Sequence, residues 1–234
     1  MASSLPRAAP DAHPARPGAN SPTAEPRQRP APRPHNGGRA PTAPPSRRSL
    51  GSVKDLLSAA GGLTLRPWHE RDLTAVRDAF NEPGMYTQFG SVLDEGQVDD
   101  AAAGRWIDRH TERWEQGSAF SWAVVEGPAA DAPLLGNVAV SQVNHVHDGG
   151  WISYWTVGAA RRRGVAGAAL RALSTWCFEE LGLYRLELGH RVENDASCRT
   201  ALSAGYLVEG RQRAKLRYGT TRHDVELHAR LATD

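Results

Sequence analysis

The chain has 234 residues and a net charge of +2, and 40% of its residues are hydrophobic. This length suffices for one domain of ordinary size plus an extension. No apolar run approaches the roughly 20 residues that cross a membrane, so we expect a cytoplasmic protein without membrane contact.

Residues 1–50 differ in composition from the rest of the chain. They hold twelve of the sixteen prolines and eight arginines against two acidic residues, so their charge is +6 and that of residues 51–234 is −4. Such a segment buries too little apolar surface to offset chain entropy, and we expect it to be disordered. A twin-arginine export signal is excluded because Lys54 and Asp55 interrupt the apolar run that it needs, and the prolines argue against a transit peptide. We favour a solvated extension over an arm that binds RNA.

The folded domain is expected to span residues 63–232, with 51–62 as a linker or a short helix over 52–60. Apolar residues at three- and four-residue spacing predict helices, and alternating apolar residues predict strands. The predicted helices lie at 68–80, 97–116, 165–181 and 195–204. The predicted strands lie at 63–67, 119–126, 134–143, 151–157, 184–192, 206–210 and 223–231, with a polar hairpin or loop at 211–221.

These elements predict an α+β fold of three-layer α/β type. Six or seven strands form a mixed, largely antiparallel sheet, and about four helices flank it. A loop at 85–92 contains Tyr86 and Phe89, whose rings either line an acceptor pocket or pack on the core.

The turn that begins the helix at 165–181 carries unusual charges. Three arginines precede this helix and two glutamates lie near its end, so the charges at both ends oppose the helix macrodipole. An anion bound at the N-terminus would reverse that local cost, and Gly164 and Gly167 let backbone N–H groups approach it. The turn is therefore either a phosphate site or a solvated basic turn.

Several motifs together resemble the GNAT superfamily of acetyl-CoA-dependent N-acetyltransferases, over about residues 63–232. The cofactor loop of that family has Gln or Arg, two variable residues, Gly, one variable residue and Gly or Ala, and here reads Arg161-Arg162-Arg163-Gly164-Val165-Ala166. The later signatures resemble the branch that acetylates ribosomal protein N-termini. They are Arg185-Leu186-Glu187-Leu188, Asn194-Asp195-Ala196-Ser197, Ala204-Gly205-Tyr206 and Glu209-Gly210.

The resemblance implies where acetyl-CoA would bind. Its pantetheine arm would run along the strand at 151–157, and its pyrophosphate would lie on the first turn of the following helix. The strands on either side of that helix would diverge to leave a slot for the thioester, whose carbonyl a backbone N–H near Thr156 or Val157 would polarise. The implied cofactor-binding residues are Trp155, Thr156, Val157, Arg162, Arg163, Gly164, Val165, Ala166, Gly167, Asn194 and Ser197.

The catalytic residues are less clearly marked by the motifs. Many family members have a tyrosine seven residues after the motif asparagine, and it acts as the general acid that protonates the departing thiolate. This chain has Ala201 at that position. Ser197 is the alternative proton donor to the thiolate, although it could also cap its helix beside Asn194. Glu187 and His190 are candidate bases, and their spacing of three along a strand directs them to opposite faces. A water-mediated route without a single base stays open.

The remaining sequence features concern metals, partners and alternatives to catalysis. His145, His147 and Asp148 lack a third ligand at a suitable spacing, and the two cysteines are separate, so we expect no metal. The expected partners are acetyl-CoA and an amine, either a protein N-terminus or a small molecule, and the resemblance leaves a homodimer open. Because the tyrosine at position 201 is absent, an acyl-CoA-binding module without turnover is the alternative function.

Overall fold

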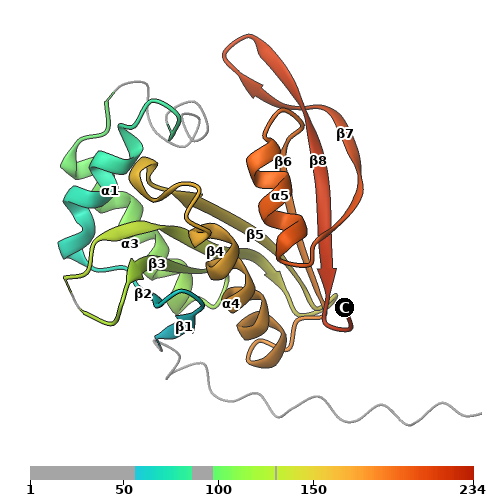
Figure 1. Cartoon of the computed structure of the whole chain (residues 1–234), viewed down its shortest axis with the longest axis horizontal. Coiled ribbons are helices and arrows are strands. Elements are labelled where there is room, and N and C mark those ends of the chain that lie inside the picture. The colour runs from blue at the N-terminus through green and yellow to red at the C-terminus, as the bar shows by residue number, and fades with distance from the viewer. Residues whose placement is uncertain (1–55, 86–96, 130) are drawn as a thin grey trace, which may run out of the picture. The chain divides into compact units, whose positions relative to one another are not determined.

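A computed structural model describes residues 56–85, 97–129 and 131–234 (Figure 1). The predicted disordered tail and the loop tyrosine Tyr86 lie outside these described residues, as does Phe89. Among the described helices, none is both long and apolar enough to cross a membrane.

The described residues form one sheet of eight strands in the order β1-β2-β3-β4-β5-β6-β8-β7. All neighbouring strands are antiparallel except β5 and β6, which are parallel. The strands are β1 (Leu57–Ala59), β2 (Leu63–Pro67), β3 (Phe120–Glu126), β4 (Leu134–Asn144), β5 (Gly149–Thr156), β6 (Arg185–Arg191), β7 (Leu207–Tyr218) and β8 (Thr221–Leu231).

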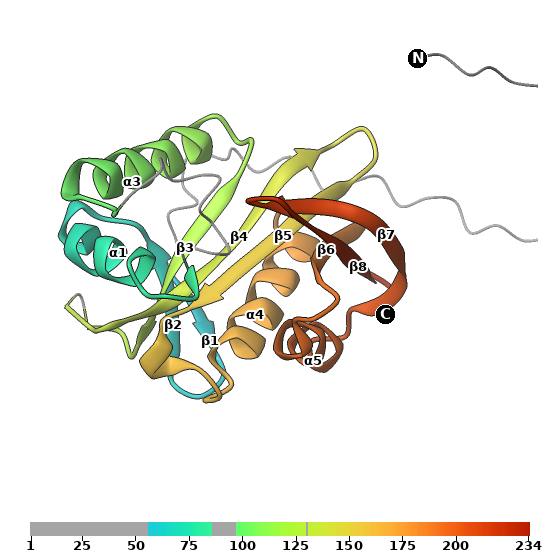
Figure 2. The same ribbon diagram turned by 90° about the horizontal axis from the view of Figure 1, so that it is seen from above.

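Four α-helices cover the two faces of this sheet. Figure 2 shows α1 and α3 on one face and α4 and α5 on the other. The helices are α1 (Leu73–Phe80), α3 (Asp100–Glu115), α4 (Val165–Glu179) and α5 (Asp195–Ser203). Each lies where the apolar spacing predicts a helix, so the mixed three-layer fold is confirmed.

Each face of the sheet buries its own apolar cluster. On the α4 face, Leu170 and Leu173 are fully buried among strand residues that include Trp122. On the other face, Trp155 of β5 packs with Trp68 and other aromatic residues under α1 and α3. Because successive strand residues point to opposite faces, β5 contributes to both clusters.

The parallel pair β5–β6 is joined at one end only. Its ladder covers Gly149, Gly150 and Trp151, which pair with residues 185–187 of β6, and beyond these residues the two strands diverge. A Cβ at Gly150 would lie 2.7 Å from Cγ2 of Val140, so only glycine permits the close packing at the joined end. The divergence predicted on either side of the helix at 165–181 is therefore confirmed.

One part of the predicted fold is wrong. In the region expected to be a linker or a short helix, Leu57–Ala59 instead forms strand β1, which pairs with β2. The segment at 211–221, predicted as a polar hairpin or loop, is a hairpin, in which β7 continues to Tyr218 and pairs with β8 through two irregularities in register. The β7 residues are mainly exposed, so their polar side chains left the choice open although the backbone is extended. Strand β1 raises the strand count of the described residues to eight.

One buried ion pair links β2 to the turn before α1. The guanidinium of Arg66 donates to both carboxylate oxygens of Asp72, at 2.7 and 2.6 Å, and both side chains are less than 10% exposed. Removing one member would leave the other charge buried without its partner.

We therefore expect Asp72→Ala to lower the free energy of unfolding by about 3 to 5 kcal/mol. The control is Asp78→Ala, which removes a carboxylate that is 62% exposed and pairs with Arg77 at 2.8 Å. This exposed pair should contribute far less to stability than the buried Arg66–Asp72 pair. Urea denaturation measures both variants, and equal small losses would contradict the buried role of Asp72.

Candidate active site

The first turn of α4 offers uncapped backbone N–H groups. Gly164 precedes the helix with φ of 79°, and no side chain caps the helix N-terminus. The first helical hydrogen bond runs from Ala168 N–H to the Gly164 carbonyl, so the N–H groups of residues 165–167 come before it. Arg162 also has a positive φ of 61°, which completes a tight turn around this helix end. Such a terminus attracts anions.

The three arginines of the turn have different neighbours. Arg161 donates to the Thr156 carbonyl and to Glu82, each at 3.2 Å. Arg163 pairs with Glu126 at 3.1 Å and does not line the cavity described next, whereas Arg162 does. Two of the arginines thus hold the turn against neighbouring elements.

A cavity of about 880 Å³ lies between the α4 N-terminus, the end of β5 and the start of α5. Five arginines and one acidic side chain, Glu193, line it, so its charge suits a polyanion. The arginines are Arg161, Arg162, Arg171, Arg191 and Arg199. Of the sequence-predicted cofactor residues, the cavity is lined by Trp155, Thr156, Arg162, Gly164, Val165, Ala166, Gly167, Asn194 and Ser197, but not by Val157 or Arg163.

The diverging part of β5 leaves backbone groups without a neighbouring strand. The N–H of Val157 donates to the Leu135 carbonyl of β4 at 3.0 Å. Because alternate residues of a strand direct their backbone groups to opposite edges, those of Tyr154 and Thr156 face the gap toward β6. Thr156, rather than Val157, therefore has an N–H directed to the gap. The Trp155 side chain belongs to the aromatic cluster on the other face, so only its backbone is near the cavity.

A pair of hydroxyl groups lies where β5 and α5 meet across the gap. The Tyr154 hydroxyl is 2.8 Å from Oγ of Ser197 and 3.2 Å from the Ser197 carbonyl. Asn194 accepts from the Ser197 N–H at 3.1 Å and thereby caps α5. Burial raises the pKa of Tyr154 above its ordinary value, against the opposing effect of the Ser197 hydrogen bond, so the phenol stays protonated at neutral pH.

Sequence reasoning missed Tyr154 as a candidate catalytic residue. The alternation of strand 151–157 places it on the face opposite Trp155, and this was the available signal. Its partner Ser197 is 43 residues away, so the contact itself follows only from the packing of α5 on the sheet.

The two predicted bases lie on opposite faces of β6, as their spacing indicates, and neither lines the cavity. The Glu187 carboxylate accepts from Nε of Arg185 at 2.7 Å and is 44% exposed. His190 is buried, with Nδ1 2.9 Å from the Arg191 carbonyl and Nε2 2.9 Å from Nε2 of His228. Among the residues described, neither candidate forms a hydrogen bond with Tyr154 or Ser197.

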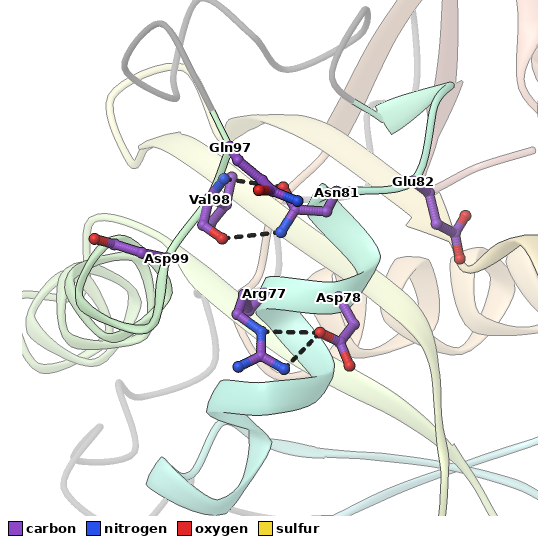
Figure 3. Close-up of a pocket in the computed structure, with 7 residues that line it drawn as sticks. All are labelled: Arg77, Asp78, Asn81, Glu82, Gln97, Val98 and Asp99. Atoms are coloured by element: carbon purple, nitrogen blue, oxygen red, sulfur yellow. Dashed lines mark hydrogen bonds and ion pairs between the residues drawn. The ribbon is translucent and has the colours of Figure 1, made fainter.

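A second hollow, of about 560 Å³, lies between α1 and the segment that leads into α3 (Figure 3). Its polar side chains largely form hydrogen bonds and ion pairs with neighbouring residues of the protein. Asn81 bonds both the N–H and the carbonyl of Val98, each at 2.9 Å, and Arg77 pairs with Asp78. The helix N-terminus at this hollow, that of α3, is already capped by the Asp99 side chain, and no strand residue lines the hollow, so we assign it no chemistry.

The parallel strands β5 and β6 thus diverge beside an uncapped helix that begins after Gly164, and the cavity at this helix end is lined by arginines. Residues 62–207, more than half of the chain, match the family model described as the acetyltransferase (GNAT) domain. The chain therefore belongs to the GNAT acetyltransferase family.

Individual relatives agree with this assignment. The chain is 29% identical over 118 residues to the Bacillus subtilis (strain 168) protein named "Putative ribosomal N-acetyltransferase YdaF". The matched segment covers 50% of this chain and 64% of YdaF. The chain thus spans less than two thirds of that relative. This likeness supports the resemblance, seen in the sequence, to the Rim-type branch of the family, which is the branch that acetylates ribosomal protein N-termini.

Solved structures share the fold at lower identity. Mycobacterium smegmatis RimJ in complex with CoA-disulfide matches with a TM-score of 0.64 and 22% identity, over 77% of this chain and 89% of that one. RimL, a ribosomal L7/L12 alpha-N-protein acetyltransferase in complex with CoA, matches with a TM-score of 0.67 and 17% identity, over 76% and 98%.

Proposed function

We propose that this protein transfers the acetyl group of acetyl-CoA to a primary amine by direct attack in a ternary complex. The observation that carries this proposal is the basic cavity at the uncapped α4 N-terminus, which opens along the diverging edge of β5. It offers a phosphate site and a strand edge in one continuous space.

The residues present fit acetyl-CoA in charge and shape. The N–H groups of residues 165–167 would hold the pyrophosphate. The positive φ of Gly164 turns the chain just before them, and Gly164 has no side chain that would block the approach of the phosphate. Arg162 would add charge-assisted contacts to phosphate oxygens. The outward backbone N–H and carbonyl of Tyr154 would bond an amide group of the pantetheine arm as an added strand does.

The hydroxyl pair would serve the leaving group. The amine nitrogen attacks the thioester carbon, a C–N bond forms, and the oxyanion accepts a hydrogen bond from the Thr156 N–H. The C–S bond then breaks, and the CoA thiolate takes a proton from Ser197, which Tyr154 can replenish through their 2.8 Å contact. The amine also loses a proton, so the products are an amide and free CoA thiol.

The base is a separate part of the proposal. Glu187 lies on the β6 face opposite His190 and next to the point where β5 and β6 part, so it can receive the amine proton directly or through water. His190 stays the second candidate named from the sequence, although both of its ring nitrogens face other groups.

We propose a protein N-terminal α-amine as the first acceptor to test, because of the likeness to YdaF and RimL, with small-molecule amines as the alternative.

The test is a thiol-release assay with acetyl-CoA and two acceptor sets, peptides with free N-termini and small polyamines. We expect turnover with at least one set, and mass spectrometry of the product should show one added acetyl group. An N-terminally blocked peptide without lysine is the control and should release no CoA. Tight CoA binding with no turnover on any acceptor would overturn the proposed reaction and favour a binding module.

A further inference from the structure

A cluster of four potential metal ligands lies behind the cavity wall. It consists of His190 on β6, Glu226 and His228 on β8, and Cys198 in the first turn of α5. One ligand atom from each residue lies within 4.8 Å of all the others. The Glu226 carboxylate oxygen is 3.2 Å from Nε2 of His228, 3.3 Å from Sγ of Cys198 and 3.6 Å from Nε2 of His190.

Backbone carbonyl groups determine which nitrogen of each histidine carries the proton. Nδ1 of His190 is 2.9 Å from the Arg191 carbonyl oxygen, and Nδ1 of His228 is 3.2 Å from the Tyr206 carbonyl oxygen. A carbonyl oxygen only accepts, so each Nδ1 must donate, and each neutral ring then has its lone pair on Nε2. Metal-binding histidines commonly donate their other ring N–H to a backbone carbonyl in this way.

The two lone pairs therefore point at each other. The Nε2 atoms of His190 and His228 are 2.9 Å apart, beside the carboxylate of Glu226, and both rings are almost fully buried. Three electron-rich atoms converging in a buried space require a positive charge between them. A shared extra proton or a metal cation can supply it.

We propose that these four residues bind a zinc-type divalent cation. Two imidazole nitrogens, a thiolate and a carboxylate are ligands that Zn²⁺ takes in tetrahedral sites, with bonds of about 2.0–2.3 Å and hence about 3.3–3.8 Å between ligand atoms. The four separations given above, from 2.9 to 3.6 Å, need only small adjustments to reach that range, and the two distances from Sγ to the imidazole nitrogens lie within 4.8 Å. On binding, the Cys198 thiol releases its proton to solvent, and the 2+ charge balances one thiolate and one carboxylate.

The cation would join α5 to β6 and β8, and residues of α5 and β6 line the basic cavity. Cys198 directly follows Ser197, so a bond from the metal to Sγ would hold the first turn of α5 against β6 and β8. No metal is expected from the sequence because His145, His147 and Asp148 lack a third ligand at a suitable spacing and the two cysteines are separate. The four ligands proposed here are spread over residues 190–228, so no local spacing marks them. The site is independent of the proposed acyl transfer, and in it His190 would be a ligand instead of a base.

The test uses the full chain, purified without chelator and with its affinity tag removed. We expect about one zinc per chain by elemental analysis, and a fall in the midpoint of thermal unfolding after chelation that added Zn²⁺ reverses. With Co²⁺ in place of zinc, a thiolate-to-metal charge-transfer band and the d–d bands of a tetrahedral site should appear. Cys198→Ser should abolish the charge-transfer band and weaken zinc binding at least about 100-fold.

Two controls keep the result specific. Cys177→Ala removes the other thiol, and His147→Gln removes an exposed histidine, so both variants should keep the cobalt spectrum and the zinc affinity. His228→Gln provides a second ligand variant if Cys198→Ser does not fold. Folded wild-type protein that shows no cobalt spectrum and no thermal response to zinc would overturn the proposal and assign the histidine pair to a shared proton.

Discussion

Replacing Gly164 by glutamate is expected to weaken CoA binding about 100-fold, which corresponds to about 2.7 kcal/mol. The new carboxylate would lie at the N-terminus of α4, where the pyrophosphate is proposed to bind, and would occupy the N–H groups that the phosphate needs. No heavy atom lies within 4 Å of a Cβ built at Gly164, so the side chain has room and acts through its charge.

The matched control is Gly164→Gln. It has the same length and experiences the same backbone strain at φ of 79°, but it carries no charge. Both variants should lose similar thermal stability, and the glutamine variant should bind CoA far more tightly than the glutamate variant. Calorimetry with CoA measures the difference. If folded Gly164→Glu keeps the wild-type affinity, the phosphate does not bind at this helix.

Removing either hydroxyl of the pair Tyr154–Ser197 is expected to lower kcat about 100-fold without a comparable loss of CoA affinity. The reason is that a proton donor acts on the thiolate only as the C–S bond breaks, and such a group contributes about 10²–10⁴-fold. Burial holds the pKa of Tyr154 above its ordinary value, so its hydroxyl keeps its proton across the usual assay range. Single-turnover kinetics on Ser197→Ala and Tyr154→Phe measure this step.

The control for the hydroxyl pair is Ser203→Ala. Ser203 lies on the same helix and lines the same cavity, but its hydroxyl donates to the Thr200 carbonyl at 2.9 Å instead of contacting Tyr154. Its loss should leave kcat within a few-fold of wild type. The double variant of Tyr154 and Ser197 should be little slower than either single variant, since the two groups act as one unit. Fully multiplicative losses would show that the hydroxyls act independently.

The local patterns of the sequence determined most of the fold. The apolar spacing at 165–181 and the glycine at position 164 marked α4 and its start, because a helix buries one stripe and its turn needs a positive φ. The alternation along 184–192 correctly separated the faces of Glu187 and His190. The same reasoning failed at 57–59, and it left 211–221 open between a hairpin and a loop, because short or exposed strands carry little apolar pattern.

The tertiary structure alone decided which side chains meet. Tyr154 reaches Ser197 because β5 and β6 diverge and α5 packs across the gap, and His190 reaches His228 because β6 pairs with β8 in one particular register. Periodicity reports how each element lies against the core, but it carries no information on the register and packing between elements distant in sequence. The sequence therefore determined the turn that begins α4 and the family, whereas the hydroxyl pair and the candidate metal ligands emerged only when the strands were placed side by side.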